Sequence, residues 1–169
     1  MISEVDRAVR ESLTDFFREI RALHWRGRER EAVSLYAFGF LLKQCSPGRP
    51  LHDPAQIGIE VAVPGIGEVN RKRQVCKDLV IWRTRGMTCW DDGWAITNSP
   101  LAILEWKVGR RASRHSELSA YDLAWLTRFS SSRRDFAGYV VSLNVAAGHE
   151  SLAVGRVRRG KADSAWLQI

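Results

Sequence analysis

The chain has 169 residues, the length of one domain, so a single fold must carry the whole function. Hydrophobic residues make up 45% and charged residues 27%, which is typical of a folded globular protein and excludes global disorder. The formal net charge is +7, and residues 101–169 supply most of it, with 11 basic and 6 acidic side chains. This excess favours a polyanionic partner such as nucleic acid, with an ordinary solvated surface as the alternative.

Cysteine, histidine and hydropathy patterns indicate the compartment. The three cysteines are odd in number and form no CxxC pair, which is typical of a reducing cytoplasm. The four histidines are scattered and none lies at ligand spacing from a cysteine, so we expect no zinc site. The N-terminus carries acidic residues and no apolar run reaches about 18 residues, so we expect a cytoplasmic protein that does not enter a membrane.

Two helices are predicted before any strand. Apolar residues recur in steps of three and four from Ile2 to Leu23, and Ser3 with Asp6 resembles a capping box, so an amphipathic helix takes up about residues 3–23. A second helix is predicted over residues 28–43, ended by the turn residues of 46–50.

Strands follow from residue 57 onward. Apolar alternation predicts a strand over 57–63, and apolar runs predict strands over 75–82 and 101–108. Helical spacing returns over 117–129, and two closing strands are predicted over 138–145 and 152–157. The predicted order is ααβββαββ, which makes a single α/β domain with a mixed central sheet flanked by helices.

Charged residues interrupt two of the apolar strands, at Lys77, Asp78, Glu105 and Lys107. A carboxylate in a buried strand is costly unless it is paired or bound to a cation. Alternation places Glu105 and Lys107 on one face, with Trp106 pointing into the packed layer on the other. If these strands are neighbours, the carboxylates of Asp78 and Glu105 and the Trp106 carbonyl converge as oxygen ligands suited to Mg²⁺ or Mn²⁺.

Asp78 followed by Glu105-Trp106-Lys107 resembles the motif of the PD-(D/E)XK nuclease superfamily, which has the restriction-endonuclease-like fold. The apolar frames KDLVIW and AILEWKV, the preceding helix and the element order are also similar, and the resemblance covers about residues 28–145. Lys77 stands where the family usually has proline. The resemblance implies a metal-dependent endonuclease of a defence, restriction or repair type, in which Asp78, Glu105 and the Trp106 carbonyl hold the metal and Lys107 orients the attacking water.

Many members of the family add a glutamate from the helix before the sheet. The run from Arg28 to Val33 resembles the start of that helix in archaeal Holliday-junction resolvases, and the match selects Glu29. Helical periodicity leaves Glu31 open, because the two glutamates share faces with different apolar residues. Glu60 is a third candidate, although it could equally form a salt bridge at the rim of the site.

Basic side chains of the second half are candidates for phosphate contacts in a common groove. The resemblance favours DNA over RNA as the partner and is compatible with a homodimer or a larger defence or repair complex. Trp90 and Trp94 lie in a loop between the two catalytic strands that could approach a substrate. The candidates for nucleic-acid binding are Arg110, Arg111, Arg114, Arg133, Arg134, Arg156, Arg158, Arg159 and Lys161.

Two alternatives to an active site would account for the same residues. Asp78 and Lys107 could form a cross-strand ion pair while Glu105 pairs with an arginine, which would make the charges structural. A non-catalytic nucleic-acid-binding or assembly module that retains the nuclease fold would carry the same sequence pattern. Divalent-metal-dependent cleavage separates an enzyme from such a module.

Overall fold

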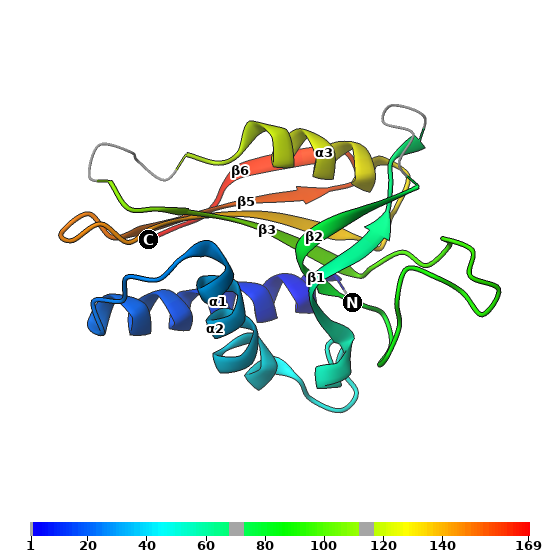
Figure 1. Ribbon diagram of the computed structural model, residues 1–169, viewed down its shortest axis with the longest axis horizontal. Coiled ribbons are helices and arrows are strands. Elements are labelled where there is room, and N and C mark those ends of the chain that lie inside the picture. Colours follow the sequence, from blue (N-terminus) through cyan, green and yellow to red (C-terminus); the bar gives the residue numbers. More distant parts are fainter. Residues whose placement is uncertain (1, 68–72, 112–116) are drawn as a thin grey trace.

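A computed structural model describes residues 2–67, 73–111 and 117–169 and shows one α/β domain (Figure 1). Its six strands form one mixed sheet in chain order, in which β3 and β4 are parallel and every other neighbouring pair is antiparallel. Helices α1 and α2 cover one face of the sheet, and α3 covers the other. The elements are α1 (Ile2–Ala22), α2 (Glu29–Gly39), 3-10 turns at Leu41–Gln44 and Pro54–Gln56, β1 (Ile57–Pro64), β2 (Gln74–Ile81), β3 (Ala102–Gly109), α3 (Ala120–Ser131), β4 (Ala137–Asn144), β5 (Ser151–Arg158) and β6 (Lys161–Gln168).

The predicted order of the elements is correct up to β5, but the structure has one further strand, β6, at the end. Three strands follow α3, not two, because residues 161–168 form an edge strand that pairs with β5. Its first five residues are exposed and only Trp166 and Leu167 are buried, so the segment lacks the apolar alternation that marks a strand. The helix predicted over 28–43 is also shorter, because α2 ends at Gly39 and a 3-10 turn replaces its last part.

The sheet separates two apolar cores. Below it, Trp106 packs edge-on against Phe16, with ring centres 5.6 Å apart, and lies 5.1 Å from the ring of Tyr36. Above it, Leu126 and Phe129 of α3 pack on the opposite face of the strands. Trp106 therefore occupies the inner layer that alternation predicts for it, and Glu105 is directed toward the α3 side.

Strands β1 and β2 change faces halfway along their length. Ile59 and Leu79 belong to the core beneath α1 and α2, whereas Val61 and Val75 belong to the core beneath α3. The change occurs at Glu60, whose φ of 51° interrupts the extended backbone. Beyond this point β2 also separates from β3, because their ladder covers only residues 79–81 and 102–104. The result is a fork in the sheet that begins at residue 78.

Helix α1 is fastened to the last strands by a buried polar network. The Asp6 carboxylate accepts a hydrogen bond from the Tyr139 hydroxyl at 2.6 Å and forms ion pairs with Arg156 at 3.0 Å and Arg158 at 3.2 Å. Burial, the Asp6 charge and the hydrogen bond to Asp6 together raise the pKa of the Tyr139 hydroxyl well above its usual range. Tyr139 therefore serves as a neutral donor that helps to anchor α1.

All three cysteines, Cys45, Cys76 and Cys89, are free thiols. This agrees with the odd cysteine count and the lack of a CxxC pair. Within the described ranges, no helix combines the length and the apolar character needed to cross a membrane.

Candidate active site

The fork between β2 and β3 brings Asp78 and Glu105 together. Asp78 Oδ2 accepts a hydrogen bond from the backbone N–H of Trp106 at 2.7 Å. The backbone N–H of Asp78 in turn donates to Glu105 Oε2 at 3.4 Å. Each carboxylate thus contacts the backbone of the other strand where the regular ladder has ended, as the strand pattern predicts for a shared site.

Glu105 forms a buried ion pair with Lys77. Both residues are 6% exposed, and Lys77 Nζ lies 3.7 Å from the centre of the Trp125 ring. Burial raises the pKa of the Glu105 carboxyl to about 7, against the charge and hydrogen bond of Lys77, which lower it, while Asp78 and Asp122 raise it further. Lys77 thus provides the positive charge nearest to this carboxylate.

Lys107 lies between the Trp106 carbonyl and helix α2. Its Nζ donates to the Trp106 oxygen at 2.6 Å and forms an ion pair with Glu29 Oε1 at 3.5 Å. Burial lowers the pKa of Lys107, but the surrounding carboxylates, led by Glu29 and Asp78, outweigh burial and raise it. Lys107 therefore remains an ammonium ion at neutral pH and serves as a donor.

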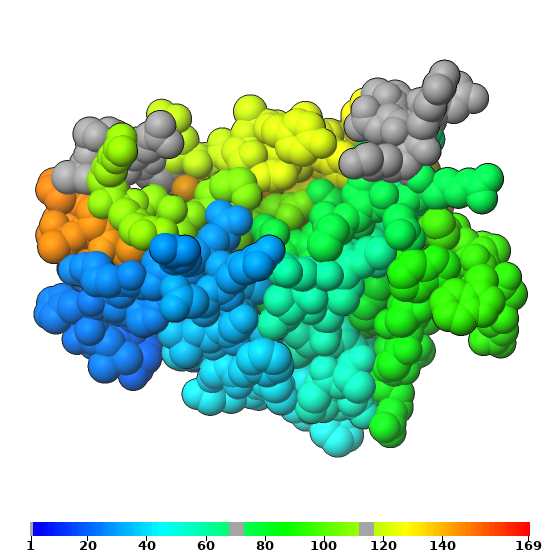
Figure 2. All heavy atoms as spheres, in the orientation of Figure 1, coloured from blue at the N-terminus to red at the C-terminus, as the bar shows by residue number. Residues whose placement is uncertain are grey.

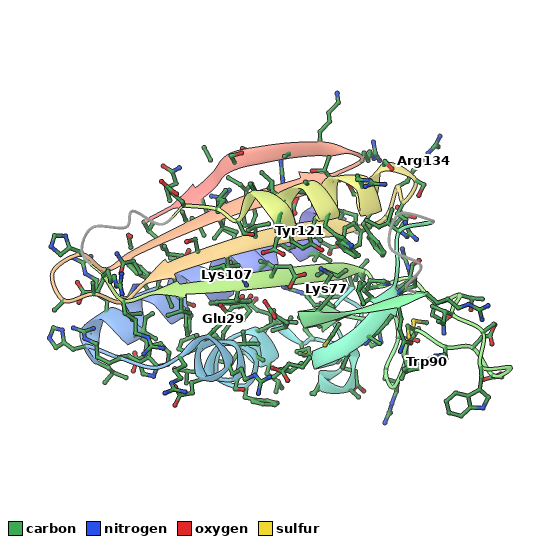
Figure 3. All side chains as sticks on the ribbon, turned by 45° about the horizontal axis from the view of Figure 1, so that its top comes forward. Glu29, Lys77, Trp90, Lys107, Tyr121 and Arg134 are labelled. Atoms are coloured by element: carbon green, nitrogen blue, oxygen red, sulfur yellow. The ribbon has the colours of Figure 1, made fainter. Side chains whose placement is uncertain are left out.

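The structure distinguishes the three candidate glutamates. Glu31 Oε2 accepts a hydrogen bond from the backbone N–H of Arg28 at 2.6 Å, so it stabilises the start of α2 and is not directed at the site. Glu60 pairs with Arg30 at 2.6 Å, which is the rim salt bridge considered from the sequence. Glu29, Glu60 and Asp78 line one cavity of about 350 Å³, and Figure 3 shows Glu29 beside Lys107.

The sequence left open two structural ion pairs, Asp78 with Lys107 and Glu105 with an arginine, and the structure contains neither pair. Lys107 pairs with Glu29 and not with Asp78. Glu105 pairs with Lys77 and not with an arginine. The sequence marks Lys77 as a charge within an apolar strand and as a departure from the family pattern, but not as the partner of Glu105, because alternation from Leu79 places its side chain on the other face.

The predicted basic residues do not form one continuous group. Arg110 and Arg111 follow the end of β3, whereas Arg133 and Arg134 precede the start of β4. Because β3 and β4 are parallel, these two pairs lie at opposite ends of the sheet. Arg159 and Lys161 flank the β5–β6 turn, where the backbone N–H of Gly160 donates to Ser130 of α3, near the second pair. Arg114 lies outside the described residues.

Three of the predicted basic residues have structural partners. Arg156 and Arg158 hold Asp6. The Arg133 guanidinium lies 3.9 Å from the centre of the Phe129 ring and donates to the Phe129 carbonyl. These arginines already have partners inside the fold, so the exposed Arg110 and Arg111, which follow the strand that carries Glu105 and Lys107, are better candidates for phosphate contacts.

The tryptophan loop extends away from the fork. Trp94 is 80% exposed, and its ring centre is 6.3 Å from that of Trp90. The segment between β2 and β3 forms a projection at one end of the molecule (Figure 2), and Figure 3 shows Trp90 well away from Glu29 and Lys107. The expectation that this loop reaches substrate at the catalytic strands therefore gains no support from its position.

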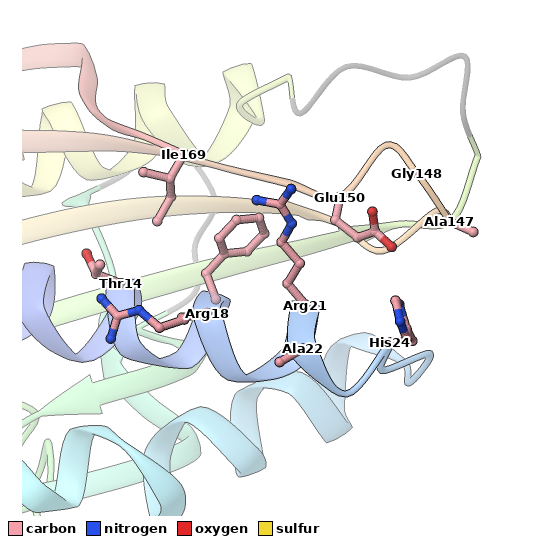
Figure 4. A pocket seen from close by; sticks show the side chains of 10 residues that line it. Thr14, Arg18, Arg21, Ala22, His24, Ala147, Gly148, Glu150 and Ile169 are labelled. Atoms are coloured by element: carbon pink, nitrogen blue, oxygen red, sulfur yellow. The ribbon is translucent and has the colours of Figure 1, made fainter.

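A larger cavity, of about 820 Å³, lies between the second half of α1 and the β4–β5 turn (Figure 4). Arg21, His24 and Glu150 are among the residues that line it. None of the predicted metal ligands or catalytic residues borders it.

The donor set at the fork fits a hard divalent cation in its chemistry. Within residues 2–67, 73–111 and 117–169, no three His, Cys, Asp or Glu side chains form a preassembled cluster for a metal ion. Three carboxylates near the fork have cationic partners, since Glu29 pairs with Lys107, Glu60 with Arg30 and Glu105 with Lys77. Asp78 forms no ion pair with a described residue, and its oxygens are of the type that Mg²⁺ prefers.

The chain matches no protein-family model, and no curated protein or solved structure is significantly similar to it. The assignment of a function therefore depends on the geometry and chemistry of the site.

Proposed function

We propose that this protein is a metal-dependent nuclease that hydrolyses phosphodiester bonds, with DNA as its substrate. The observation that carries the proposal is the meeting of Asp78 and Glu105 at the fork, beside a lysine that contacts the Trp106 carbonyl. The resemblance to the PD-(D/E)XK motif supports the same assignment. The exposed Arg110 and Arg111, at the end of the strand that carries Glu105 and Lys107, supply positive charge for the DNA backbone.

In this proposal Asp78, Glu105 and the Trp106 carbonyl would hold Mg²⁺ or Mn²⁺. When bound, the cation supplies charge that stabilises the phosphoryl transition state and lowers the pKa of a bound water. Lys107 stays protonated, so it orients water or a phosphate oxygen and does not act as the general base. Glu29 holds the Lys107 ammonium in place from α2.

One observation favours a second candidate function. Lys77 is bound to Glu105, and this internal cation neutralises a carboxylate that an active nuclease would use for metal. A non-catalytic module that binds nucleic acid would keep such a pair permanently. The two functions differ in one measurable property, because the module would bind DNA without cutting it.

The test is cleavage of supercoiled plasmid DNA, and of RNA in parallel, with Mg²⁺, Mn²⁺ or EDTA. Wild-type protein should cut DNA only with a divalent metal, and Asp78→Asn should cut at least about 100-fold more slowly. Asp135→Asn is the matched control, because this exposed carboxylate lies at the far end of α3 and should leave the rate unchanged. A mobility shift of DNA without any cleavage would support the module and refute the nuclease.

A further inference from the structure

The tryptophan loop, residues 82–101 between β2 and β3, is a folded segment that the proposed nuclease site does not use. Connections of this length without a helix or strand of their own are uncommon and are often functional. Cys89 is fully buried and anchors the loop in the core beneath α3, and Trp90 and Ile96 form an antiparallel bridge. The loop is therefore held in one shape, which gives its side chains defined positions.

Asp91 closes the turn at the tip of this loop. Its Oδ1 accepts hydrogen bonds from the backbone N–H groups of Gly93 and Ala95, both at 2.9 Å, and its Oδ2 accepts one from the Thr97 hydroxyl at 3.1 Å. The backbone of Trp94, between Gly93 and Ala95, is in the left-handed region with a φ of 60°. This conformation is costly for a residue as large as tryptophan, whereas glycine adopts it readily. The turn alone gives no reason for a tryptophan at this position.

The Trp94 side chain projects into solvent beside a cavity. It is 80% exposed, and its ring centre lies 6.3 Å from that of the half-buried Trp90, with the ring planes inclined at 55°. Together with Met87, the two rings line a cavity of about 570 Å³ in the segment that projects at one end of the molecule (Figure 2). This volume lies within the range of ligand pockets, and an exposed indole ring is a typical anchor for a bound group.

Most polar side chains that line the cavity are occupied within the protein. Asn98 donates to the Trp90 carbonyl at 2.7 Å, and the Thr88 hydroxyl accepts from the Trp90 backbone N–H at 3.4 Å. Asp91 is used in the turn at the tip. Asp92 is exposed and forms neither a hydrogen bond nor an ion pair with any residue that the structure describes. Its carboxylate is therefore available to a ligand, beside the two indole rings.

The charges around the cavity favour a cation. Among the described residues that line it, Arg85 is the one basic side chain, and it forms an ion pair with Asp53 at 3.7 Å. Asp91 and Asp92 contribute two carboxylates, on a protein whose formal net charge is +7. Such carboxylates repel the phosphates of nucleic acid, so these rings are poorly placed to stack on DNA bases. The face of an indole ring attracts a cation.

We propose that the cavity of the tryptophan loop binds an organic cation with an alkylated ammonium head, which contacts the rings of Trp90 and Trp94 and is neutralised by Asp92. Alkyl groups on the nitrogen favour this cavity because a bare ammonium ion is strongly hydrated. A free quaternary ammonium compound and a trimethylated lysine of another polypeptide share this chemistry. The inference does not depend on the nuclease function, since Trp90 lies well away from Glu29 and Lys107 (Figure 3).

The test is titration of the protein with choline chloride, followed by the NMR signals of the indole N–H groups at constant ionic strength. The control ligand is 3,3-dimethylbutan-1-ol, which has the shape of choline without its charge. Choline should shift the signals of Trp90 and Trp94 saturably, and the uncharged alcohol should bind at least about 10-fold more weakly. Equal affinity for the two compounds would overturn the inference.

A second titration distinguishes the sources of the cation. It uses a short peptide of glycine and serine that carries one trimethyllysine, and the same peptide with unmodified lysine. Tighter binding of the trimethyllysine peptide than of choline would assign the site to a modified polypeptide, and the reverse order would assign it to a free small molecule. No saturable shift with either choline or the trimethyllysine peptide would refute the proposal.

Variants identify the groups that hold the cation. Trp94→Gly should weaken choline binding by about 2- to 30-fold, the range of one cation–π contact. Asp92→Asn should weaken it by about 2- to 5-fold, as expected for an exposed ion pair. The matched controls are Tyr121→Ala, which removes a 70% exposed ring from the start of α3, and Asp135→Asn, which changes an exposed carboxylate; both should bind choline as wild type does.

Thermal unfolding separates a ligand role of Trp94 from a structural one. Glycine relieves the left-handed backbone, so the melting temperature of Trp94→Gly should equal or exceed that of wild type while its choline affinity falls. A lower melting temperature with unchanged choline affinity would make Trp94 a structural residue and overturn the inference. A Trp94→Gly variant that loses affinity for DNA but not for choline would place the loop in a nucleic-acid interface instead. Asp78→Asn should bind choline as wild type does, so failure of the proposed function is distinguishable.

Discussion

Replacing Glu105 by glutamine tests whether burial or the Lys77 pair dominates the energetics of the fork. Burial raises the pKa of this carboxyl from 4.5 to about 7, despite the opposing effect of Lys77. The folded protein therefore retains the Glu105 proton over a pH range in which the unfolded chain has lost it. The stability that this proton provides is complete below pH 4.5 and is lost as the pH rises to about 7.

The pKa difference converts to about 3 kcal/mol, at about 1.4 kcal/mol for each tenfold change in the binding constant of the proton. Glutamine cannot ionise, so Glu105→Gln should match wild type at about pH 4.5 and exceed its unfolding free energy by about 3 kcal/mol at about pH 7.5. Urea denaturation with EDTA across this range measures the difference.

Val157→Ala provides a control for this experiment. Val157 is buried in the same core beneath α3 and has no ionisable group, so its difference from wild type should be the same at every pH. A Glu105→Gln variant that becomes less stable than wild type as the pH rises would refute the reasoning. It would show that the attraction of Lys77 exceeds the cost of burying the charge.

Two further predictions address the charges outside the fork. Asp6→Asn leaves Arg156 and Arg158 without their shared anion and should lower the unfolding free energy by about 2–3 kcal/mol in urea denaturation; a loss below about 0.5 kcal/mol would mean that the network contributes little. Arg110→Ala and Arg111→Ala should each reduce the slope of log affinity for DNA against log salt by about one, for every DNA sequence tried, and slopes equal to that of wild type would remove both residues from the interface.

Periodicity predicts the main elements because each buries one face. The apolar steps of α1 from Ile2 to Ile20 are all buried, so the sequence pattern and the packing agree there, whereas Leu23, the last residue of the predicted pattern, follows the helix and is exposed. β6 lacks such a pattern because an edge strand with six exposed residues out of eight has little core to fill. Its presence depends on pairing with β5, which is a tertiary contact and leaves little trace in local sequence.

One residue at the candidate site, Lys77, was missed for a physical reason. Lys77 escapes strand alternation because β2 changes face beyond Asp78, and this change accompanies the positive φ of Glu60 in the neighbouring strand.

The attachment of α1 to the far end of the sequence has a consequence for biosynthesis. Helix α1 is synthesised before the strands that it packs on, and Asp6 finds its partners on β4 and β5, at least 133 residues later. Arg10 lies 4.5 Å from the centre of the Trp166 ring and donates to the Trp166 carbonyl, so part of its docking surface is made later still. The part of α1 that docks through Asp6 and Arg10 therefore cannot be completely packed until β6 has been synthesised, although Phe16 can meet Tyr36 and Trp106 earlier.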